Sequence, residues 1–204
     1  LLSIMGVINL NTDIIMLGWL RTPEEVGYYA AAQKVIQLLY VFPTLLAISI
    51  FPIMSRLTQT DSTRVKNILE RVVAGVILFS IPIAIIGIIF ATPIIHLFFG
   101  DAYAPTAAVF RLLMVTIVIV YPSAIIGHAI FAYDAQKNFV GFVIVATLTN
   151  AILNLVLIPL SGTTGAALAT ILSQLLTNTL IWRRMRRING FTVWPSLKAY
   201  LHIS

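Results

Sequence analysis

Two charged residues lie inside long apolar segments of this sequence. Asp13 is part of LSIMGVINLNTDIIMLGWL, and Lys34 is part of VGYYAAAQKVIQLLYVFPTLLAISIFP. A charge in the hydrocarbon of a membrane is costly, so such side chains usually face a protein interior or a water-filled cavity. The two residues therefore indicate ion or ligand chemistry within a membrane.

Polar side chains with oxygen ligands recur in two later apolar segments. Asn150 and Asn154 are four residues apart and share one face of a helix over 138–160, and Thr170 lies in the following segment. Carboxylate, amide and hydroxyl oxygens are hard ligands, which suit Na⁺ or proton-linked exchange. The alternative is that these groups only hydrogen-bond neighbouring helices to one another.

The positions of Asp13 and Lys34 allow them to meet. A short loop joins their helices, which makes the helices antiparallel neighbours, and both residues lie roughly 10–13 Å below the same membrane surface. An Asp13–Lys34 ion pair that holds the helices together is one alternative to a functional site. Lys34 can also extend its long side chain toward the surface, whereas the short side chain of Asp13 cannot.

The composition is that of an integral membrane protein. Of the 204 residues, 59% are hydrophobic and 10% are charged, and the mean hydropathy is +0.98, whereas soluble domains carry about 25% charge. The sequence has no cysteine, which excludes a thiol nucleophile and a cysteine metal site. We find no spacing typical of a catalytic triad or a phosphate loop, so an enzyme is not expected.

Six apolar segments are long enough to cross a membrane core about 30 Å thick. We therefore predict an all-α polytopic membrane protein, with a bundle of six transmembrane helices over 1–182. The predicted spans are 1–20, 26–55, 69–98, 106–132, 138–160 and 164–182.

The basic residues gather on one side of these spans. By the positive-inside rule, loops 56–71 and 133–138 and the C-terminal segment face the cytoplasm of a cell membrane. We predict that residues 183–204 form a basic cytoplasmic segment. Because this charge follows topology, nucleic acid is not an expected partner. The basic residues on this side are Arg56, Arg64, Lys66, Arg71, Lys137, Arg183, Arg184, Arg186, Arg187 and Lys198.

Four stretches of the chain resemble one transporter family. They are TDIIMLGWLRTPEEVGYYAAAQKV, ISIFPIMSRL, IIHLFFGDAY and TNAILNLVLIPLSGTTGAALAT. In order and spacing they resemble the C-terminal half of bacterial and archaeal polysaccharide flippases, across roughly residues 5–182. These belong to the superfamily that also contains multidrug-extrusion antiporters and lipid II flippases.

The resemblance implies one lobe of a two-lobed transporter that moves isoprenoid-diphosphate-linked oligosaccharide outward by alternating access. The N-terminal lobe of the same protein would be absent from this sequence, and residues 183–204 would lead toward further C-terminal helices. Implied partners are the lipid-linked oligosaccharide, membrane lipids, the N-terminal lobe and polysaccharide assembly proteins. No cofactor is expected beyond a coupling ion, Na⁺ or H⁺.

The resemblance also suggests roles for particular residues. Lys34 is a candidate contact for an anionic diphosphate or acidic sugar. His128, near the cytoplasmic end of the fourth span, is a second substrate-binding candidate, although a hydrogen-bonded packing role is its alternative. The cation-coupling candidates are Asp13, Asn150, Asn154 and Thr170.

Two other functions remain open at this point. The first is a cation-coupled antiporter for drugs or other small molecules, from the same superfamily. The second is a membrane-embedded glycan polymerase or transferase, which the short outer loops disfavour.

Overall fold

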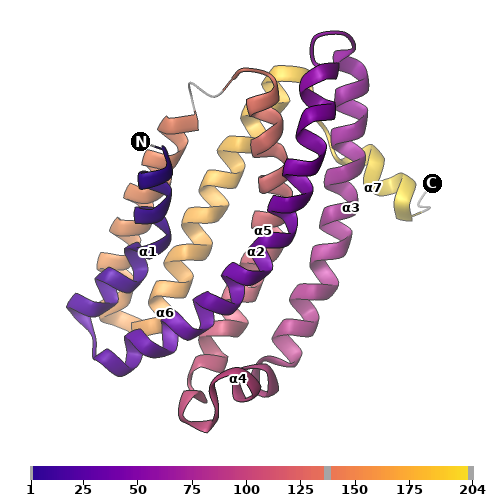
Figure 1. The fold of residues 1–204 in the computed structure, drawn as a ribbon. Coiled ribbons are helices and arrows are strands. Elements are labelled where there is room, and N and C mark those ends of the chain that lie inside the picture. The colour runs from indigo at the N-terminus through magenta and orange to yellow at the C-terminus, as the bar shows by residue number, and fades with distance from the viewer. Residues whose placement is uncertain (1, 136–138, 202–204) are drawn as a thin grey trace.

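The fold is an elongated bundle of helices that run up and down along one axis (Figure 1). The computed structural model describes residues 2–135 and 139–201 of the chain. The elements are α1 (Leu2–Leu20), α2 (Pro23–Leu57), α3 (Ser62–Ile89), α4 (Ala91–Phe99), the short 3₁₀ helix η1 (Asp101–Tyr103), α5 (Thr106–Ala132), α6 (Phe139–Asn189) and α7 (Trp194–Leu201).

Helix α6 is a hairpin of two legs rather than one rod. Gly162 breaks it with φ 57° and ψ −133°, which is a conformation that glycine adopts most readily. The chain reverses there, so that a first leg (139–161) and a second leg (163–189) run antiparallel (Figure 1). At Gly165 a Cβ atom would lie 2.1 Å from the carbonyl oxygen of Leu157, so glycine is needed where the legs approach.

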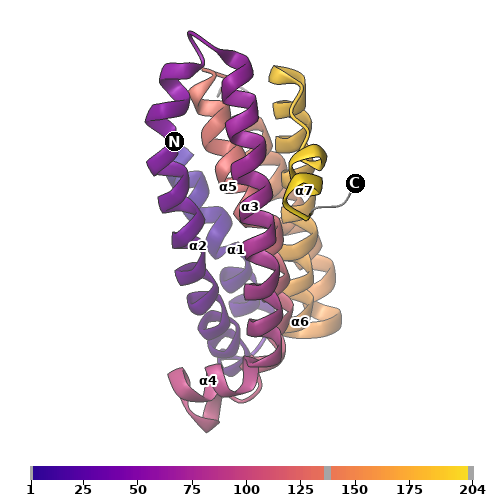
Figure 2. The same cartoon turned by 90° about the vertical axis from the view of Figure 1, so that its right-hand side faces the viewer.

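The region of the predicted third span differs from the expectation. The structure divides 69–98 at Phe90 into α3, which begins earlier at Ser62, and the short α4. Figure 2 shows α4 turned away from the bundle axis at one end. Pro93 lies in the first turn of α4, where its missing N–H breaks no helical hydrogen bond. The sequence carries no signal for this break, because the residues on both sides of Phe90 are hydrophobic.

Four helices of the described chain are long and apolar enough to cross a membrane, namely α2, α3, α5 and α6. Helix α5 is the most enclosed of them. It contributes Phe110, Met114, Ile117 and Tyr121 to the largest fully buried side chains, and it packs against α2, α3 and α6.

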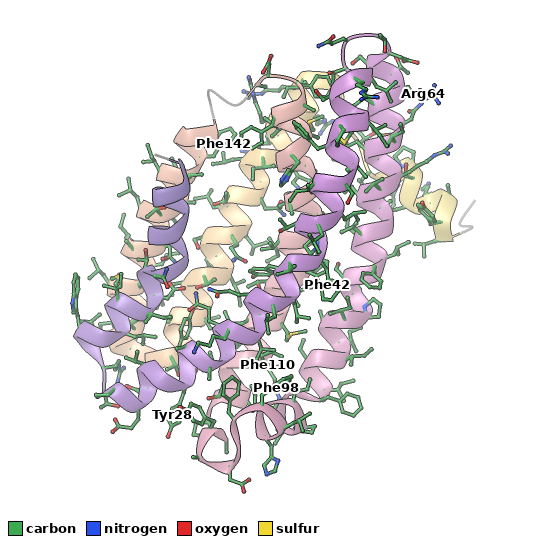
Figure 3. All side chains as sticks on the ribbon, viewed as in Figure 1. Tyr28, Phe42, Arg64, Phe98, Phe110 and Phe142 are labelled. Carbon is green, nitrogen blue, oxygen red and sulfur yellow. The ribbon has the colours of Figure 1, made fainter. Side chains whose placement is uncertain are left out.

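The outward faces of the bundle are apolar. Leu38, Phe42 and Leu45 of α2 are each between 58% and 65% exposed, and α3 and α6 carry similar side chains (Figure 3). Exposed apolar surface of this extent marks contact with lipid or with another protein surface.

Most described basic residues lie at one end of the bundle. The α2–α3 loop, the end of α5 and the end of α6 meet there, whereas the α1–α2 junction, α4 and the break at Gly162 lie at the opposite end (Figure 1). Arg64 is labelled at the first end in Figure 3. Lys137 and part of loop 133–138 lie outside the described residues.

The basic C-terminal segment is partly helical and packs on the bundle. Arg183–Arg187 lie in the last turns of α6, beyond the predicted end at 182, and α7 contacts α3. The amide N of Thr192 donates a 2.7 Å hydrogen bond to Oε1 of Glu70 in α3. The Phe191 ring, 2% exposed, lies edge-on to Trp182 with 5.6 Å between ring centroids.

Candidate functional site

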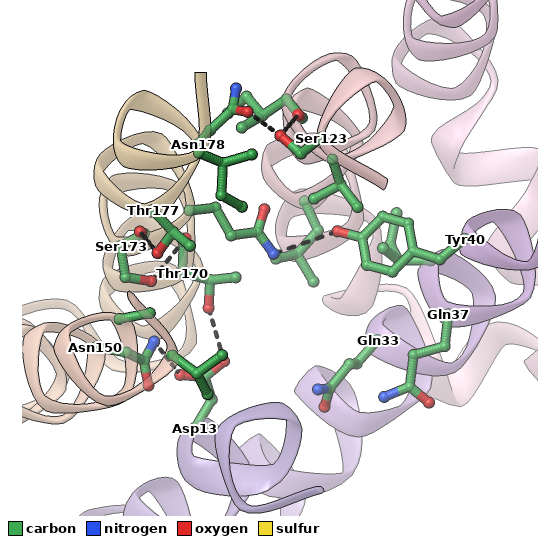
Figure 4. A pocket seen from close by; sticks show the side chains of 18 of the residues that line it. Asp13, Gln33, Gln37, Tyr40, Ser123, Asn150, Thr170, Ser173, Thr177 and Asn178 are labelled. Carbon is green, nitrogen blue, oxygen red and sulfur yellow. Dashed lines mark hydrogen bonds between the residues drawn. The ribbon is translucent and has the colours of Figure 1, made fainter. Parts of the chain in front are cut away.

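The carboxylate of Asp13 is the centre of the most developed polar network in the described chain. Asp13 is 3% exposed. Its Oδ2 accepts hydrogen bonds from the Tyr29 hydroxyl at 2.8 Å and the Thr170 hydroxyl at 2.7 Å. Its Oδ1 accepts from Nδ2 of Asn150 at 2.9 Å and Nδ2 of Asn154 at 2.6 Å. Figure 4 shows Asp13 between Asn150 and Thr170.

The partners of Asp13 also bind one another. Nδ2 of Asn154 donates a 3.0 Å hydrogen bond to Oδ1 of Asn150, and the hydroxyls of Tyr29 and Thr170 are 3.1 Å apart. Asn154 is fully buried, and its Oδ1 receives no hydrogen bond within the described chain. The network therefore joins α1, α2 and both legs of α6, and it leaves one buried oxygen beside a carboxylate without a donor.

The side chain of Arg21 fixes the geometry of α6 at the level of the break. The Nε and Nη2 atoms of Arg21 lie 3.1 and 2.7 Å from the carbonyl oxygen of Ile158, and Nη2 lies 2.9 Å from that of Pro159. The break at Gly162 removes the helical donors that these carbonyls would otherwise have. Arg21 directly follows α1, so one residue links the end of Asp13's helix to the end of the first leg.

The start of α2 places Tyr29 at the same level. Thr22 caps the helix, and its hydroxyl accepts a 3.4 Å hydrogen bond from the amide of Glu25. Pro23 occupies the first helical turn, where proline is favoured. The turn between α1 and α2 is therefore short, and Tyr29 is brought back toward Asp13.

A cavity of about 180 Å³ opens beside the carboxylate. Its walls come from α1, α2, α5 and α6 (Figure 4). A water molecule needs roughly 10–15 Å³ on this measure, so the space suits several waters or a hydrated ion. Besides Asp13, Asn150 and Thr170, its polar lining includes Gln33, Gln37, Tyr40, Gln174, Thr177 and Asn178.

Lys34 does not join this site. It is exposed on α2, and no ion pair links it to Asp13 within the described residues. On the same helix, Tyr29, Gln33 and Ile36 face the cavity at helical spacing, and Lys34 projects from another side. The alternative of an Asp13–Lys34 ion pair is therefore wrong, because hydroxyl and amide donors occupy the carboxylate.

His128 also lies apart from the cavity lining. It is half-buried on α5, and its Nδ1 is 2.9 Å from the carbonyl oxygen of Ala124 one turn earlier. This local hydrogen bond matches the packing alternative that the sequence left open. Its role in substrate binding remains a prediction.

Sequence reasoning grouped four site residues but missed two. Asp13, Asn150, Asn154 and Thr170 were expected as one set, and the structure brings them together. Tyr29 and Arg21 were not singled out for the site. A signal for Tyr29 existed, because a tyrosine buried in an apolar helix usually needs a hydrogen-bond partner for its hydroxyl.

The first half of the chain matches a family model. Residues 1–109 match the family described as polysaccharide biosynthesis protein. No solved structure matches the chain.

Two curated proteins of the archaeon Haloferax volcanii are similar to the chain. The probable flippase AglR is 32% identical over 178 residues, which are 85% of this chain and 37% of that protein. The probable low-salt glycan biosynthesis flippase Agl15 is 27% identical over 173 residues, which are 84% of this chain and 36% of that protein. The chain thus spans little more than a third of the length of these relatives.

Proposed function

We propose that this chain, which belongs to the family of polysaccharide biosynthesis proteins, is one lobe of a transporter for lipid-linked oligosaccharide. The transporter moves its substrate across the cytoplasmic membrane for surface polysaccharide synthesis, and it is not an enzyme. The names of the relatives support this function, since both are probable flippases and one is assigned to glycan biosynthesis. In this proposal, α1, α2, α3, α5 and the two legs of α6 are the six membrane spans, and a second lobe completes the transporter.

The observation that carries a coupled mechanism is the enclosed carboxylate of Asp13. A buried charge is costly, and in a membrane protein it usually marks an ion pathway. The acceptor oxygen of Asn154 lies in the same network and has no donor in the described chain. A monovalent cation or a proton would satisfy both groups. We therefore assign cation coupling to Asp13, Asn150, Asn154 and Thr170.

Substrate contact is assigned to a different surface. Lys34 is exposed on α2 beside apolar side chains such as Leu38. A cation on this face suits the diphosphate of a lipid carrier, because an ammonium group binds phosphate oxygens as a point charge. His128 is the second candidate for such a contact. Because coupling and substrate contact lie on separate sides of α2, cation binding would act by shifting the helices.

The test uses the full-length protein in lipid vesicles with a lipid-linked oligosaccharide and an imposed Na⁺ or pH gradient. Asp13→Asn keeps the size of the side chain and removes its charge. We expect the gradient-dependent part of transport to fall at least tenfold. Asp134→Asn is the matched control, because Asp134 is exposed and has φ 53°, which asparagine also adopts.

Two outcomes would contradict the proposal in different ways. Unchanged gradient dependence in the Asp13→Asn protein would remove Asp13 from coupling. Transport of hydrophobic cations but not of lipid-linked glycan by the unaltered protein would favour the small-molecule antiporter.

A further inference from the structure

The second leg of α6 carries a polar stripe along one face. Thr170, Ser173, Gln174, Thr177 and Asn178 all line the cavity beside Asp13, at the spacing of one helix face. The opposite face is apolar and exposed, with Leu172, Leu175 and Leu176 between 39% and 46% exposed. The leg thus places polar groups along the cavity and leucine side chains on its outer face.

The stripe covers roughly 12 Å of the membrane thickness, from Thr170 to Asn178. Asn178 is eight residues beyond Thr170 and sixteen beyond Gly162, which corresponds to roughly 12 and 24 Å along the helix. The hydrocarbon core is about 30 Å thick. The cavity wall thus leads from the level of Asp13 toward the end of the bundle that carries the α2–α3 loop.

The polar groups along this wall can bind more than their present partners. The Oε1 of Gln174 is buried and receives no hydrogen bond from the described residues. The hydroxyls of Ser173 and Thr177 donate to carbonyls of their own helix, at 3.0 and 2.8 Å. A hydroxyl that donates in this way keeps lone pairs to accept from water or to contact a cation.

A hydrogen bond joins two helices at the far end of the stripe. The Ser123 hydroxyl on α5 donates to Oδ1 of Asn178 (Figure 4). Ser123 also lies 2.9 Å from the carbonyl oxygen of Ile119 on its own helix. A single hydroxyl proton serves one acceptor at a time, so rotation of this hydroxyl would release the contact to Asn178 without unfolding either helix.

We propose that the polar stripe is the inner access path for the coupling cation, and that the Ser123–Asn178 contact is its gate. The path connects Asp13 to the side of the membrane that carries the α2–α3 loop. The ligand is a monovalent cation or proton with its hydration water. This inference rests on the proposed coupling at Asp13, but it concerns a different stretch of the protein.

The test measures water accessibility and needs no transport. The chain has no cysteine, so single cysteines can be introduced into the full-length protein after any cysteines outside this chain are replaced. Thr177→Cys lies on the stripe, and Leu176→Cys is its adjacent control on the apolar face. A charged, membrane-impermeant thiol reagent is added to vesicles from the side of the α2–α3 loop.

We expect Thr177→Cys to react at least tenfold faster than Leu176→Cys. A stripe that only packs against its neighbours would be dry, and both cysteines would then react equally slowly. That result would contradict the proposed access path. The coupling proposal would still be tested separately, by the transport assay of the Asp13→Asn protein.

The gate is tested by combining a reporter with a gate variant. Ser173→Cys lies between Asp13 and Asn178 on the stripe, and Asn178→Ala removes the acceptor of the Ser123 bond. We expect Asn178→Ala to raise the labelling rate of Ser173→Cys at least threefold. Thr179→Ala is the control, because Thr179 is exposed and its hydroxyl donates to the Leu175 carbonyl of its own helix. Equal rates with both alanine variants would overturn the gate.

Discussion

The Tyr29 hydroxyl supplies one of the four hydrogen bonds that compensate the Asp13 carboxylate in the described chain. Tyr29 is completely buried, and its hydroxyl is one of two donors to Oδ2. Hydrogen bonds to charged groups contribute roughly 1.5–3 kcal/mol each, and a buried partner left without its donor is costly. Tyr29 is therefore a site residue in the same sense as Asn150, Asn154 and Thr170, because it donates to the same carboxylate.

We predict that Tyr29→Phe lowers the free energy of unfolding by about 1.5–3 kcal/mol, because Oδ2 of Asp13 loses one of its two donors. Thermal unfolding of the purified protein in detergent measures the change. Tyr28→Phe is the neighbouring control, since Tyr28 makes an edge-on ring contact with Tyr103, at 5.9 Å, that phenylalanine retains. Equal destabilisation by the two variants would contradict the role of the hydroxyl.

At the residue scale, the site residues that could be predicted from sequence were the polar ones within apolar helices. Asp13 and Asn150 are conspicuous because they are polar residues in apolar helices. Tyr29 is not, because aromatic residues are common in such helices. The alternative of an Asp13–Lys34 ion pair was wrong, since equal depth on neighbouring helices does not determine which side of a helix faces the neighbour.

At the scale of elements, Arg21 supplies the hydrogen-bond donors that the last carbonyls of the first leg of α6 would have had in a continuous helix. Its guanidinium supplies donors to the carbonyls of Ile158 and Pro159. The planar guanidinium can bond both carbonyls at once, which the ammonium of lysine does less well. The break at Gly162 is thereby compatible with a well-formed end of the leg.

We predict that Arg21→Ala destabilises the protein by about 1–3 kcal/mol, and that Arg21→Lys recovers only part of the loss. The rate of hydrogen exchange at amides 163–166 should rise in both variants, because the second leg begins next to the carbonyls that Arg21 binds. Arg111→Ala is the control at the same end of the bundle, because Arg111 is exposed and donates a 2.8 Å hydrogen bond to the Thr92 hydroxyl rather than to the carbonyls at the break. Full recovery by lysine would mean that charge alone, and not the bridging geometry, stabilises the break.

The ends of helices could be predicted where turn-forming residues interrupt an apolar stretch of sequence. The residues SGTTG follow the predicted span 138–160, and the structure breaks at the first glycine of this stretch, Gly162. No comparable signal stands at Phe90, where apolar residues continue on both sides, and the predicted span 69–98 therefore ran through the junction of α3 and α4.

At the scale of the whole molecule, the two ends of the bundle differ in charge. Exposed Arg56, Arg64 and Arg186 lie at the end with the α2–α3 loop, whereas Arg21 lies at the other. The positive-inside rule then predicts a cytoplasmic position for the first end.

This orientation predicts opposite labelling of two exposed loop residues in intact cells. Thr60→Cys in the α2–α3 loop should be protected from an impermeant thiol reagent, and Ala104→Cys after η1 should react. Permeabilised cells should show labelling at both positions. Reaction of Thr60→Cys in intact cells would reverse the orientation.

The fold class was predictable from composition, but the partners of the bundle surface were not. Leu38 and Phe42 of α2 are exposed in the same way that lipid-facing residues of any bundle are exposed. An apolar surface presents the same chemistry to a lipid chain and to a second lobe, so the sequence pattern alone cannot assign it.

The distance along the chain between Asp13 and its partners has a consequence for biosynthesis. Thr170 is 157 residues from Asp13, and Asn150 is 137 residues away. At about 5–20 residues per second, a ribosome needs roughly 8–31 s to reach Thr170 after Asp13 has been made. Tyr29, only 16 residues away, arrives first. During this interval α1 carries a charge into the membrane with few of its final hydrogen bonds, so its lasting insertion depends on helices that have not yet been translated.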